Sequence, residues 1–249
     1  MDDRLGLVAD LFVGADTAVA FTGAGVSTAS GVPDFRNGNW DGFDLGEYHV
    51  SNLQVDPRGF WRTHVDFHDR MYDGGHEPNV AHEVLAYLER EGWLDAVVTQ
   101  NTDGLHQRAG SEHVVELHGN GTRAVCQRCR REIDADDAVA RAREGHYPPL
   151  CERCGGILRP DVTLFGERLP GEAEREARRL AEECDVMLVL GSSLAVEPGA
   201  SIATSVARGG TLVLVNDEGT EADRRAAATF RADVTEFLPE LAETILDRA

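Results

Sequence analysis

Short apolar runs, each ended by a polar or glycine-rich turn, constrain the fold of this chain more than any other feature. Several runs are continuously apolar, which is typical of parallel strands covered on both faces of a sheet. Helical segments separate most of them, and this alternation predicts a doubly wound, Rossmann-like α/β sheet. The six predicted strands are TAVAFTG (17–23), DAVVTQN (95–101), HVVELHG (113–119), DVMLVLGS (185–192), TLVLVND (211–217) and, as the least apolar, ADVTEFL (232–238).

Three segments between these runs carry the signals of helices. In residues 79–92 an apolar stripe follows a possible capping residue, Asn79, and ends at a glycine. Residues 170–184 repeat the stripe, and a third helix is expected from Pro198 to Gly209, since proline favours helix starts and glycine helix ends.

Two regions depart from this rhythm. Residues 37–77 contain many aromatic residues and glycines but no good strand, and we expect a loop followed by a helical module. Residues 122–160 contain four of the five cysteines. We expect these two insertions to form a second, smaller domain, which leaves residues 1–36, 78–121 and 161–249 for the doubly wound domain.

The charge of the chain limits its partners and its surroundings. The net charge is −20, and all 24 basic residues are arginine. A chain this acidic repels nucleic acid and anionic membranes, so we expect neither as a partner. Without lysine, the composition resembles that of proteins from a high-salt cytoplasm, where a Debye length of about 3 Å screens surface carboxylates from one another. The alternative is an unusually acidic protein from an ordinary cell.

The N-terminal segment, MDDRLGLVAD, lacks the basic region of a signal peptide. No run of 18 apolar residues is present. We therefore expect a soluble, cytoplasmic protein.

Two CxxC pairs predict a metal site. Cys126 and Cys129 form the first pair, Cys151 and Cys154 form the second, and 21 residues separate them. Four thiolates suit one tetrahedral zinc ion and leave no open position for water, so this zinc is expected to be structural. Disulfides are the alternative, which a reducing cytosol disfavours. Cys184 stands apart and is expected to be a buried apolar residue.

Polar turns follow five of the predicted strands and should meet at one edge of the sheet. They read GAGVS, TQNTDGLH, HGNG, GSSLAVEPG and NDEGT. Open α/β sheets bind ligands at the carboxyl ends of their strands, and a Gly-x-Gly turn allows close approach of a pyrophosphate. Yet residue 28 is threonine where a dehydrogenase fingerprint has its third glycine. Together the turns predict that the chain binds a dinucleotide, but they do not indicate that it transfers hydride. Each turn taken alone could have a purely structural role.

Together these motifs resemble the sirtuins, which are NAD-dependent protein-lysine deacylases. The motifs that carry the resemblance, in the family's order, are GAGVSTASGVPDFR, TQNTDGLH, ELHG, the two CxxC pairs, RPDVTLFGE, GSSLAVEP and LVNDE, between residues 17 and about 238. The resemblance implies that the doubly wound domain binds NAD, with 37–77 as cofactor loop and helical module and 122–160 as zinc ribbon. It also implies that NAD is consumed, since the acyl-lysine oxygen captures the ribose carbon as nicotinamide leaves.

The resemblance further implies roles for individual residues. His118 matches the general base, and Asn101 and Asp103 match the nicotinamide pocket, with Thr102 standing where the family usually has isoleucine. Phe35 would shield the reacting ribose from water. The implied NAD-binding residues are Gly23, Ala24, Gly25, Ser27, Phe35, Arg36, Gln100, Asn101, Asp103, Gly191, Ser192, Ser193, Asn216, Asp217 and Glu218.

The implied substrate is an acetyl-lysine protein or peptide, bound as an added strand between VTLFGE and SLAVEP. Val162, Phe165 and Val196 would contact it. His64 and Phe67 occupy the places where sirtuins that prefer succinyl or malonyl groups carry tyrosine and arginine, which favours an uncharged acyl group. The expected products are nicotinamide and O-acetyl-ADP-ribose. Two alternatives remain open: ADP-ribosyl transfer to a protein, and a non-catalytic module that binds NAD and zinc.

Overall fold

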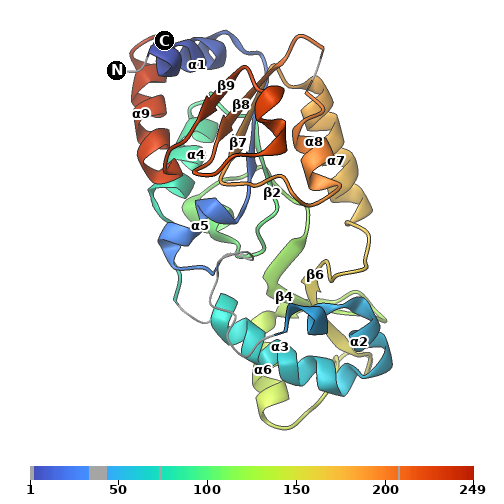
Figure 1. Cartoon of the computed structure of the whole chain (residues 1–249). Coiled ribbons are helices and arrows are strands. Elements are labelled where there is room, and N and C mark those ends of the chain that lie inside the picture. Colours follow the sequence, from blue (N-terminus) through green and yellow to red (C-terminus); the bar gives the residue numbers. More distant parts are fainter. Residues whose placement is uncertain (1–2, 34–43, 73–74, 207) are drawn as a thin grey trace.

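The computed structural model of the chain describes residues 3–33, 44–72, 75–206 and 208–249. These residues form an upper part built on the larger sheet and a lower, smaller part, with the antiparallel strands β4 (Gly119–Cys126) and β6 (Leu158–Val162) between them (Figure 1). No helix in the described ranges is long and apolar enough to cross a membrane.

The upper part is built on a six-stranded sheet in the order β3-β2-β1-β7-β8-β9, in which every neighbouring pair is parallel. The order reverses between β1 and β7, and ligands bind at such switch points in open α/β sheets. The strands are β1 (Ala18–Thr22), β2 (Ala96–Thr99), β3 (Val114–Glu116), β7 (Val186–Leu190), β8 (Thr211–Val215) and β9 (Ala228–Phe230).

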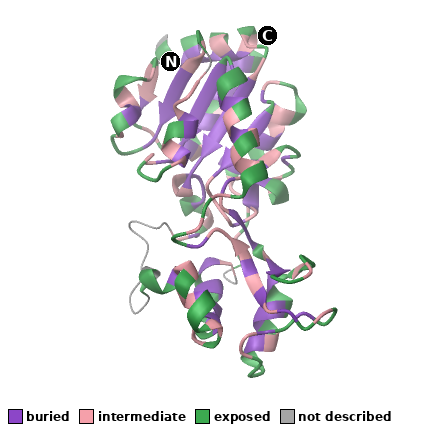
Figure 2. Cartoon of the chain, turned by 90° about the vertical axis from the view of Figure 1, so that its right-hand side faces the viewer, coloured by how far each residue is buried: buried purple, intermediate pink, exposed green. Residues whose placement is uncertain are grey.

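Helices cover both faces of this sheet, which explains why the central strands are apolar without alternation. On β7, Val186 and Leu188 pack on one face, while Met187 and Val189 pack on the other. The first face is covered by α1 (Asp3–Gly14), α4 (Val80–Arg90) and α9 (Val234–Leu246), and the second by α7 (Gly171–Glu183) and α8 (Gly199–Ala203). Figure 2 shows the strands buried along their length.

Five of the six predicted strands are confirmed, and the sixth is wrong. Residues 234–238 begin α9, and the last strand, β9, lies earlier, at Ala228–Phe230. Asp233 caps the helix by accepting a hydrogen bond from the Thr235 N–H at 2.7 Å. Val234, Phe237, Leu238 and Leu241 are buried, and their spacing is helical.

The predicted helices are confirmed, with one shorter than expected. Asn79 caps α4 as predicted, accepting from the Ala81 N–H at 2.9 Å. The helix that starts after Pro198 ends at Ala203, so α8 does not reach Gly209.

The lower part combines both insertions around one core. The first contributes a short 3₁₀ turn, η3 (Leu45–Tyr48), and the helices α2 (Val50–Val55) and α3 (Pro57–Met71). The second contributes α6 (Ala135–Arg143) and an antiparallel sheet of β5 (Glu132–Asp134), β4 (Gly119–Cys126) and β6 (Leu158–Val162). Trp61 of α3 is fully buried between them and donates its indole N–H to the Leu158 carbonyl at 2.9 Å. The expectation that the two insertions form one smaller unit agrees with this packing.

Candidate active site

A cavity of about 1110 Å³ lies at the carboxyl ends of the strands and is lined by residues of both the sheet part and the smaller part. The five polar turns converge on it, as expected from parallel strands. It brings together most of the predicted site residues: Gly23, Ala24, Gly25, Gln100, Asn101, His118, Val162, Phe165, Gly191, Ser192, Ser193, Val196, Asn216, Asp217 and Glu218. Ser27 and Asp103 lie directly behind its wall, and Phe35 and Arg36 lie outside the described residues.

The glycines after β1 allow two turns to pack against each other. A side chain on Gly23 would place its Cβ 2.8 Å from Ser192 Cβ, and one on Gly25 would lie 2.8 Å from Gly191 Cα. The Gly25 N–H donates to the Gly191 carbonyl at 2.9 Å. In the described residues up to 33, the turn is followed by two 3₁₀ turns, η1 (Ala24–Val26) and η2 (Thr28–Ser30), and not by a long helix. The missing third glycine is thus explained, because no helix needs to pack closely on the strand there.

Asn101 and Asp103 are held by the same hydroxyl group. Asn101 Nδ2 donates to Ser27 Oγ at 3.0 Å and to the Gly23 carbonyl at 3.1 Å. Ser27 Oγ in turn donates to Asp103 Oδ2 at 2.7 Å, and the Leu105 N–H donates to Asp103 Oδ1 at 2.9 Å. Both side chains are therefore fixed before any ligand binds, and each carboxylate oxygen keeps further capacity to accept.

Two buried, neutral histidines, His82 and His106, lie beside these residues and contact Ser27 and Thr22. His82 Nδ1 accepts from the Asn79 N–H at 3.3 Å, so His82 Nε2 carries the proton and faces Ser27 Oγ at 3.3 Å. Burial lowers the pKa of His82 to about 4. His106, whose pKa burial lowers to about 3, lies 2.9 Å from the Thr22 hydroxyl through Nε2. This contact joins His106 to the end of β1, and His106 is not among the residues that line the cavity.

His118 lies on the cavity wall with one ring nitrogen fixed. Its Nδ1 is 3.0 Å from the Gln100 carbonyl, which can only accept, so Nδ1 carries the proton and Nε2 keeps a free lone pair. Burial lowers the pKa of His118 below 6.5, and the bond to the Gln100 carbonyl offsets only part of this. At neutral pH the side chain is thus an unprotonated imidazole, able to accept a proton at Nε2.

The expected peptide-binding edges are less regular than the sequence suggests. Phe165 and Val196 are exposed by 54% and 56% at the cavity mouth. The Phe165 N–H and carbonyl already pair with Tyr48 and Val50, at 3.1 and 3.0 Å. Leu194 has a φ of 53°, so the SLAVEP segment is not continuously extended, although an edge for strand addition would be. The backbone groups of Phe165 are therefore already occupied and not available for the expected strand addition.

The four cysteines of the CxxC pairs meet at one point of the smaller part. All four sulfurs lie within 4.8 Å of one another, with 3.5 Å between Cys126 and Cys154 and 3.8 Å between Cys129 and Cys151. Tetrahedral zinc with Zn–S bonds of about 2.3 Å separates sulfurs by about 3.8 Å, whereas a disulfide requires about 2.05 Å. The cluster is compatible with a structural zinc and not with disulfides. Cys184 is fully buried elsewhere, as expected.

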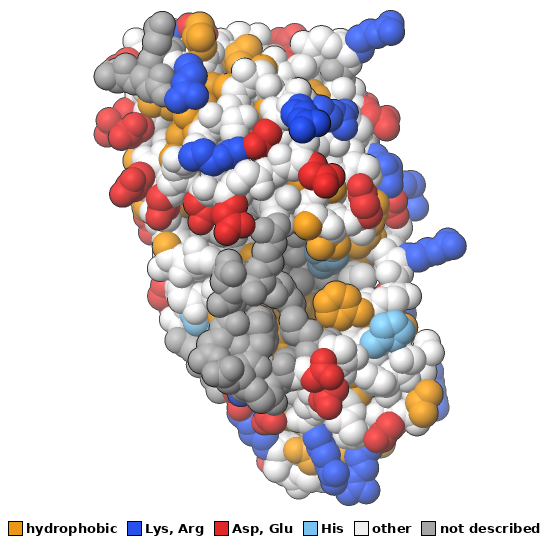
Figure 3. Space-filling model, viewed as in Figure 1, with side chains coloured by type: hydrophobic (Ala, Val, Ile, Leu, Met, Phe, Trp, Pro, Cys, Tyr) orange, Lys and Arg blue, Asp and Glu red, His pale blue; other side chains and the backbone are white. Residues whose placement is uncertain are grey.

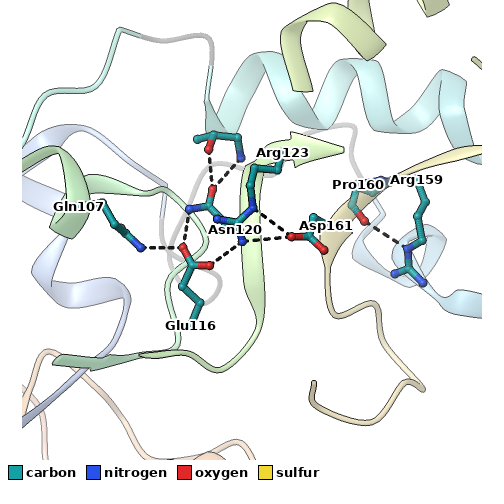
Figure 4. A network of polar contacts seen from close by, with 8 residues as sticks. Gln107, Glu116, Asn120, Arg123, Arg159, Pro160 and Asp161 are labelled. Atoms are coloured by element: carbon teal, nitrogen blue, oxygen red, sulfur yellow. Dashed lines mark hydrogen bonds and ion pairs between the residues drawn. The ribbon is translucent and has the colours of Figure 1, made fainter. Parts of the chain in front are cut away.

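A polar network fixes the strands that join the two parts (Figure 4). Glu116, the last residue of β3, accepts from Gln107 at 2.7 Å, Asn120 at 2.6 Å and Arg123 at 2.6 Å. Arg123 on β4 also donates to Asp161 on β6 at 3.1 Å. The network ties both connecting strands to the end of β3, close to His118, and so sets how the smaller part sits over the cavity.

Several cavity residues were not anticipated from the sequence. Tyr48 and Tyr72 line the cavity from the helical module, and residues 232–234 line it beside the turn after β8. Tyr48 stacks on Phe67, with ring centroids 4.2 Å apart. Nothing in the local sequence around these tyrosines signals a site, because only the packing of the module against the sheet brings them there.

Comparisons with known proteins agree with this geometry. The sequence pattern of the Sir2 family matches residues 23–198. An NAD-dependent protein deacetylase from Haloarcula marismortui is 49% identical over 98% of this chain and 95% of its own length. A solved Sir2 structure with a p53 peptide and NAD⁺ is 38% identical, with a TM-score of 0.83 over 95% of this chain and 96% of that one. Another, with an inhibitor, 2'-O-acetyl-ADP-ribose and a deacetylated p53 peptide, is also 38% identical, with a TM-score of 0.81 over 95% of this chain and 97% of that one.

Proposed function

The chain belongs to the Sir2 family and is an NAD-dependent protein deacetylase, and from that premise we propose how its own residues carry out the reaction. NAD supplies the ribose carbon that accepts the acetyl oxygen when the bond to nicotinamide breaks. One water molecule is consumed, and the products are nicotinamide, the free lysine and O-acetyl-ADP-ribose. The tasks left to the chain are to orient both substrates, to hold nicotinamide and to move one proton.

The turns after β1, β7 and β8 bind the ADP half of NAD. The backbone of Gly23–Gly25 lets the diphosphate approach closely, and Ser192 and Ser193 contact phosphate and ribose. Asn216, Asp217 and Glu218 hold the adenosine end. What supports this assignment is that all of these residues line one cavity, at the switch point where sheets of this type bind nucleotides.

Asn101 and Asp103 hold the nicotinamide end. Their fixed positions around Ser27 support this role, since groups locked before binding lose little freedom when the ligand arrives. Phe35 and Arg36 act on the reacting ribose and the phosphates.

His118 is the general base, and its orientation is the observation that carries the mechanism. Its Nδ1–H is bound to the Gln100 carbonyl, and Nε2 is free to take the proton of a ribose hydroxyl. That hydroxyl would then attack the acetyl carbon, so that the acetyl group passes to ribose and the lysine nitrogen leaves when water adds. A lowered pKa keeps this nitrogen unprotonated at neutral pH.

The acetyl-lysine side chain passes between Val162, Phe165 and Val196 toward His118. Phe67 and Tyr48 close the cavity on the side of the helical module with stacked aromatic rings. Neither side chain offers a positive charge, so an uncharged acyl group suits this wall better than a carboxylate.

The remaining proposals concern the domain boundaries, the binding partners and the cellular surroundings of the protein. We assign residues 1–36, 78–121 and 161–249 to the NAD-binding domain, 37–77 to the cofactor loop and helical module, and 122–160 to the zinc ribbon. On the face shown in Figure 3, arginine and acidic side chains are interspersed. The substrate is a protein or peptide, and from the net charge of −20 we expect no direct binding of nucleic acid or membrane. The net charge of −20 supports a cytoplasm rich in salt.

Mass spectrometry after incubation with NAD and an acetyl-lysine peptide tests this function. We expect a peptide that has lost its acetyl group and a nucleotide product that has gained it. A peptide that gains ADP-ribose instead would indicate ADP-ribosyl transfer.

A further inference from the structure

Thr102 separates the two residues assigned to the nicotinamide end, and its side chain has a partner in another part of the chain. Its hydroxyl lies 2.8 Å from the hydroxyl of Tyr72, and both residues line the cavity. Tyr72 follows directly after α3, the long helix of the helical module. This hydroxyl pair therefore joins the module to the loop that carries Asn101 and Asp103.

Tyr72 is itself held tightly in place. Its N–H donates to the His68 carbonyl at 2.8 Å, and its ring packs edge-on against Phe67 at a centroid distance of 6.3 Å. The ring also lies over Gly121 at the start of β4, where a Cβ would overlap Tyr72 Cζ. Residue 121 must therefore be glycine for the tyrosine to reach Thr102.

Gly121 also binds the backbone of Thr102. The Gly121 N–H donates to the Thr102 carbonyl at 2.8 Å, so Thr102 is bound through its backbone to β4 and through its side chain to the tyrosine after α3. On either side of it, Asn101 is bonded to Gly23 and Asp103 to Leu105. Loss of the hydroxyl pair would release only the contact with the helical module and leave the others intact.

The pair is a neutral hydrogen bond at all pH values of interest. Burial raises the pKa of Tyr72 well above its usual range. Both residues are partly buried, so removing either hydroxyl takes away the direct hydrogen bond between the helical module and the loop.

We propose that Tyr72 and Thr102 are positioning residues for nicotinamide, which couple the helical module to the nicotinamide end of the site. This inference rests on the proposed roles of Asn101 and Asp103. Through this pair the module holds the loop in the form that captures nicotinamide. Nicotinamide that rebinds reverses the first step, so the pair sets how strongly the product inhibits the enzyme.

The test removes one hydroxyl at a time. Tyr72→Phe keeps the ring over Gly121, and Thr102→Val keeps the shape of the side chain. Each change should raise the nicotinamide concentration for half-inhibition by about three- to tenfold, the factor expected for one hydrogen bond. Affinity for ADP-ribose, which lacks nicotinamide, should change less than about twofold by the same reasoning. The double variant should be no worse than either single one, because both lose the same bond.

Two further variants make the outcome decisive. Tyr87→Phe removes a tyrosine hydroxyl from α4, where the ring packs under Arg90, and should leave nicotinamide inhibition unchanged. Asp103→Asn should weaken nicotinamide inhibition if the proposed function is right. Altered inhibition in Asp103→Asn but not in Tyr72→Phe or Thr102→Val would overturn the inference alone. Equal losses of nicotinamide and ADP-ribose binding, or additive effects in the double variant, would also overturn it.

Discussion

Replacement of His118 by asparagine separates its chemistry from its place in the fold. In His118→Asn the new side-chain amide would still donate to the Gln100 carbonyl, the bond that His118 Nδ1 makes at 3.0 Å, but an amide cannot accept the ribose proton. Loss of a positioned base should lower multiple-turnover deacetylation by about 10²- to 10⁴-fold, or about 3 to 5 kcal/mol in activation free energy. Since burial lowers the pKa of His118 from its usual value, the base is unprotonated in the wild-type enzyme at pH 7.5.

Three measurements on one preparation decide the outcome. Deacetylation reports the whole reaction, exchange of labelled nicotinamide reports only the first step, and the melting temperature reports folding. We expect deacetylation to fall far more than exchange, with little change in melting temperature. If the His118→Asn enzyme deacetylates at a near-normal rate, His118 is not the base. Equal losses in exchange and deacetylation would place its role in binding instead.

The charge, the cysteines and the buried histidines each support one more prediction. With a net charge of −20 and no lysine, the melting temperature and the activity should both rise from low to molar KCl, and a flat or falling profile would contradict this. Cys151→Ser should release zinc in a colorimetric assay and abolish activity by unfolding the smaller part; a variant with full zinc and full turnover would show that the cysteines are not ligands. His64, His82 and His106 have pKa values lowered by burial to about 3, 4 and 3, so the unfolded chain binds more protons as the pH falls below about 6.5. Urea unfolding should therefore give about 4 kcal/mol less stability at pH 5.5 than at pH 7.5, and equal stabilities would mean that these groups titrate normally in the fold.

Most strands of the larger sheet could be predicted because their apolar composition indicates that they are buried. The run at Val186–Leu190 is apolar at every position since both faces of the sheet are covered. The prediction of a strand at residues 232–238 was wrong because the short alternation of polar and apolar residues there is typical of a strand. Their helical spacing becomes clear only with Leu241, one turn beyond the window.

The site was predictable where a motif sits at a strand end, and not where tertiary packing builds it. Gln100, Asn101 and His118 follow β2 and β3, so topology alone brings them together. Tyr72 reaches Thr102 only because α3 packs beside the zinc ribbon, a contact with no local signal. The sequence alone shows that Thr102 is unusual for its family. The structure shows that its hydroxyl pairs with the hydroxyl of Tyr72.

The most direct test of the central claim is the balance of products. Purified enzyme is incubated with NAD and one acetyl-lysine peptide, and nicotinamide, deacetylated peptide and O-acetyl-ADP-ribose are quantified together over time. The account predicts that all three form in equal amounts and that none forms without NAD. Deacetylation that yields free acetate without nicotinamide, or nicotinamide release with ADP-ribose attached to the peptide, would contradict it.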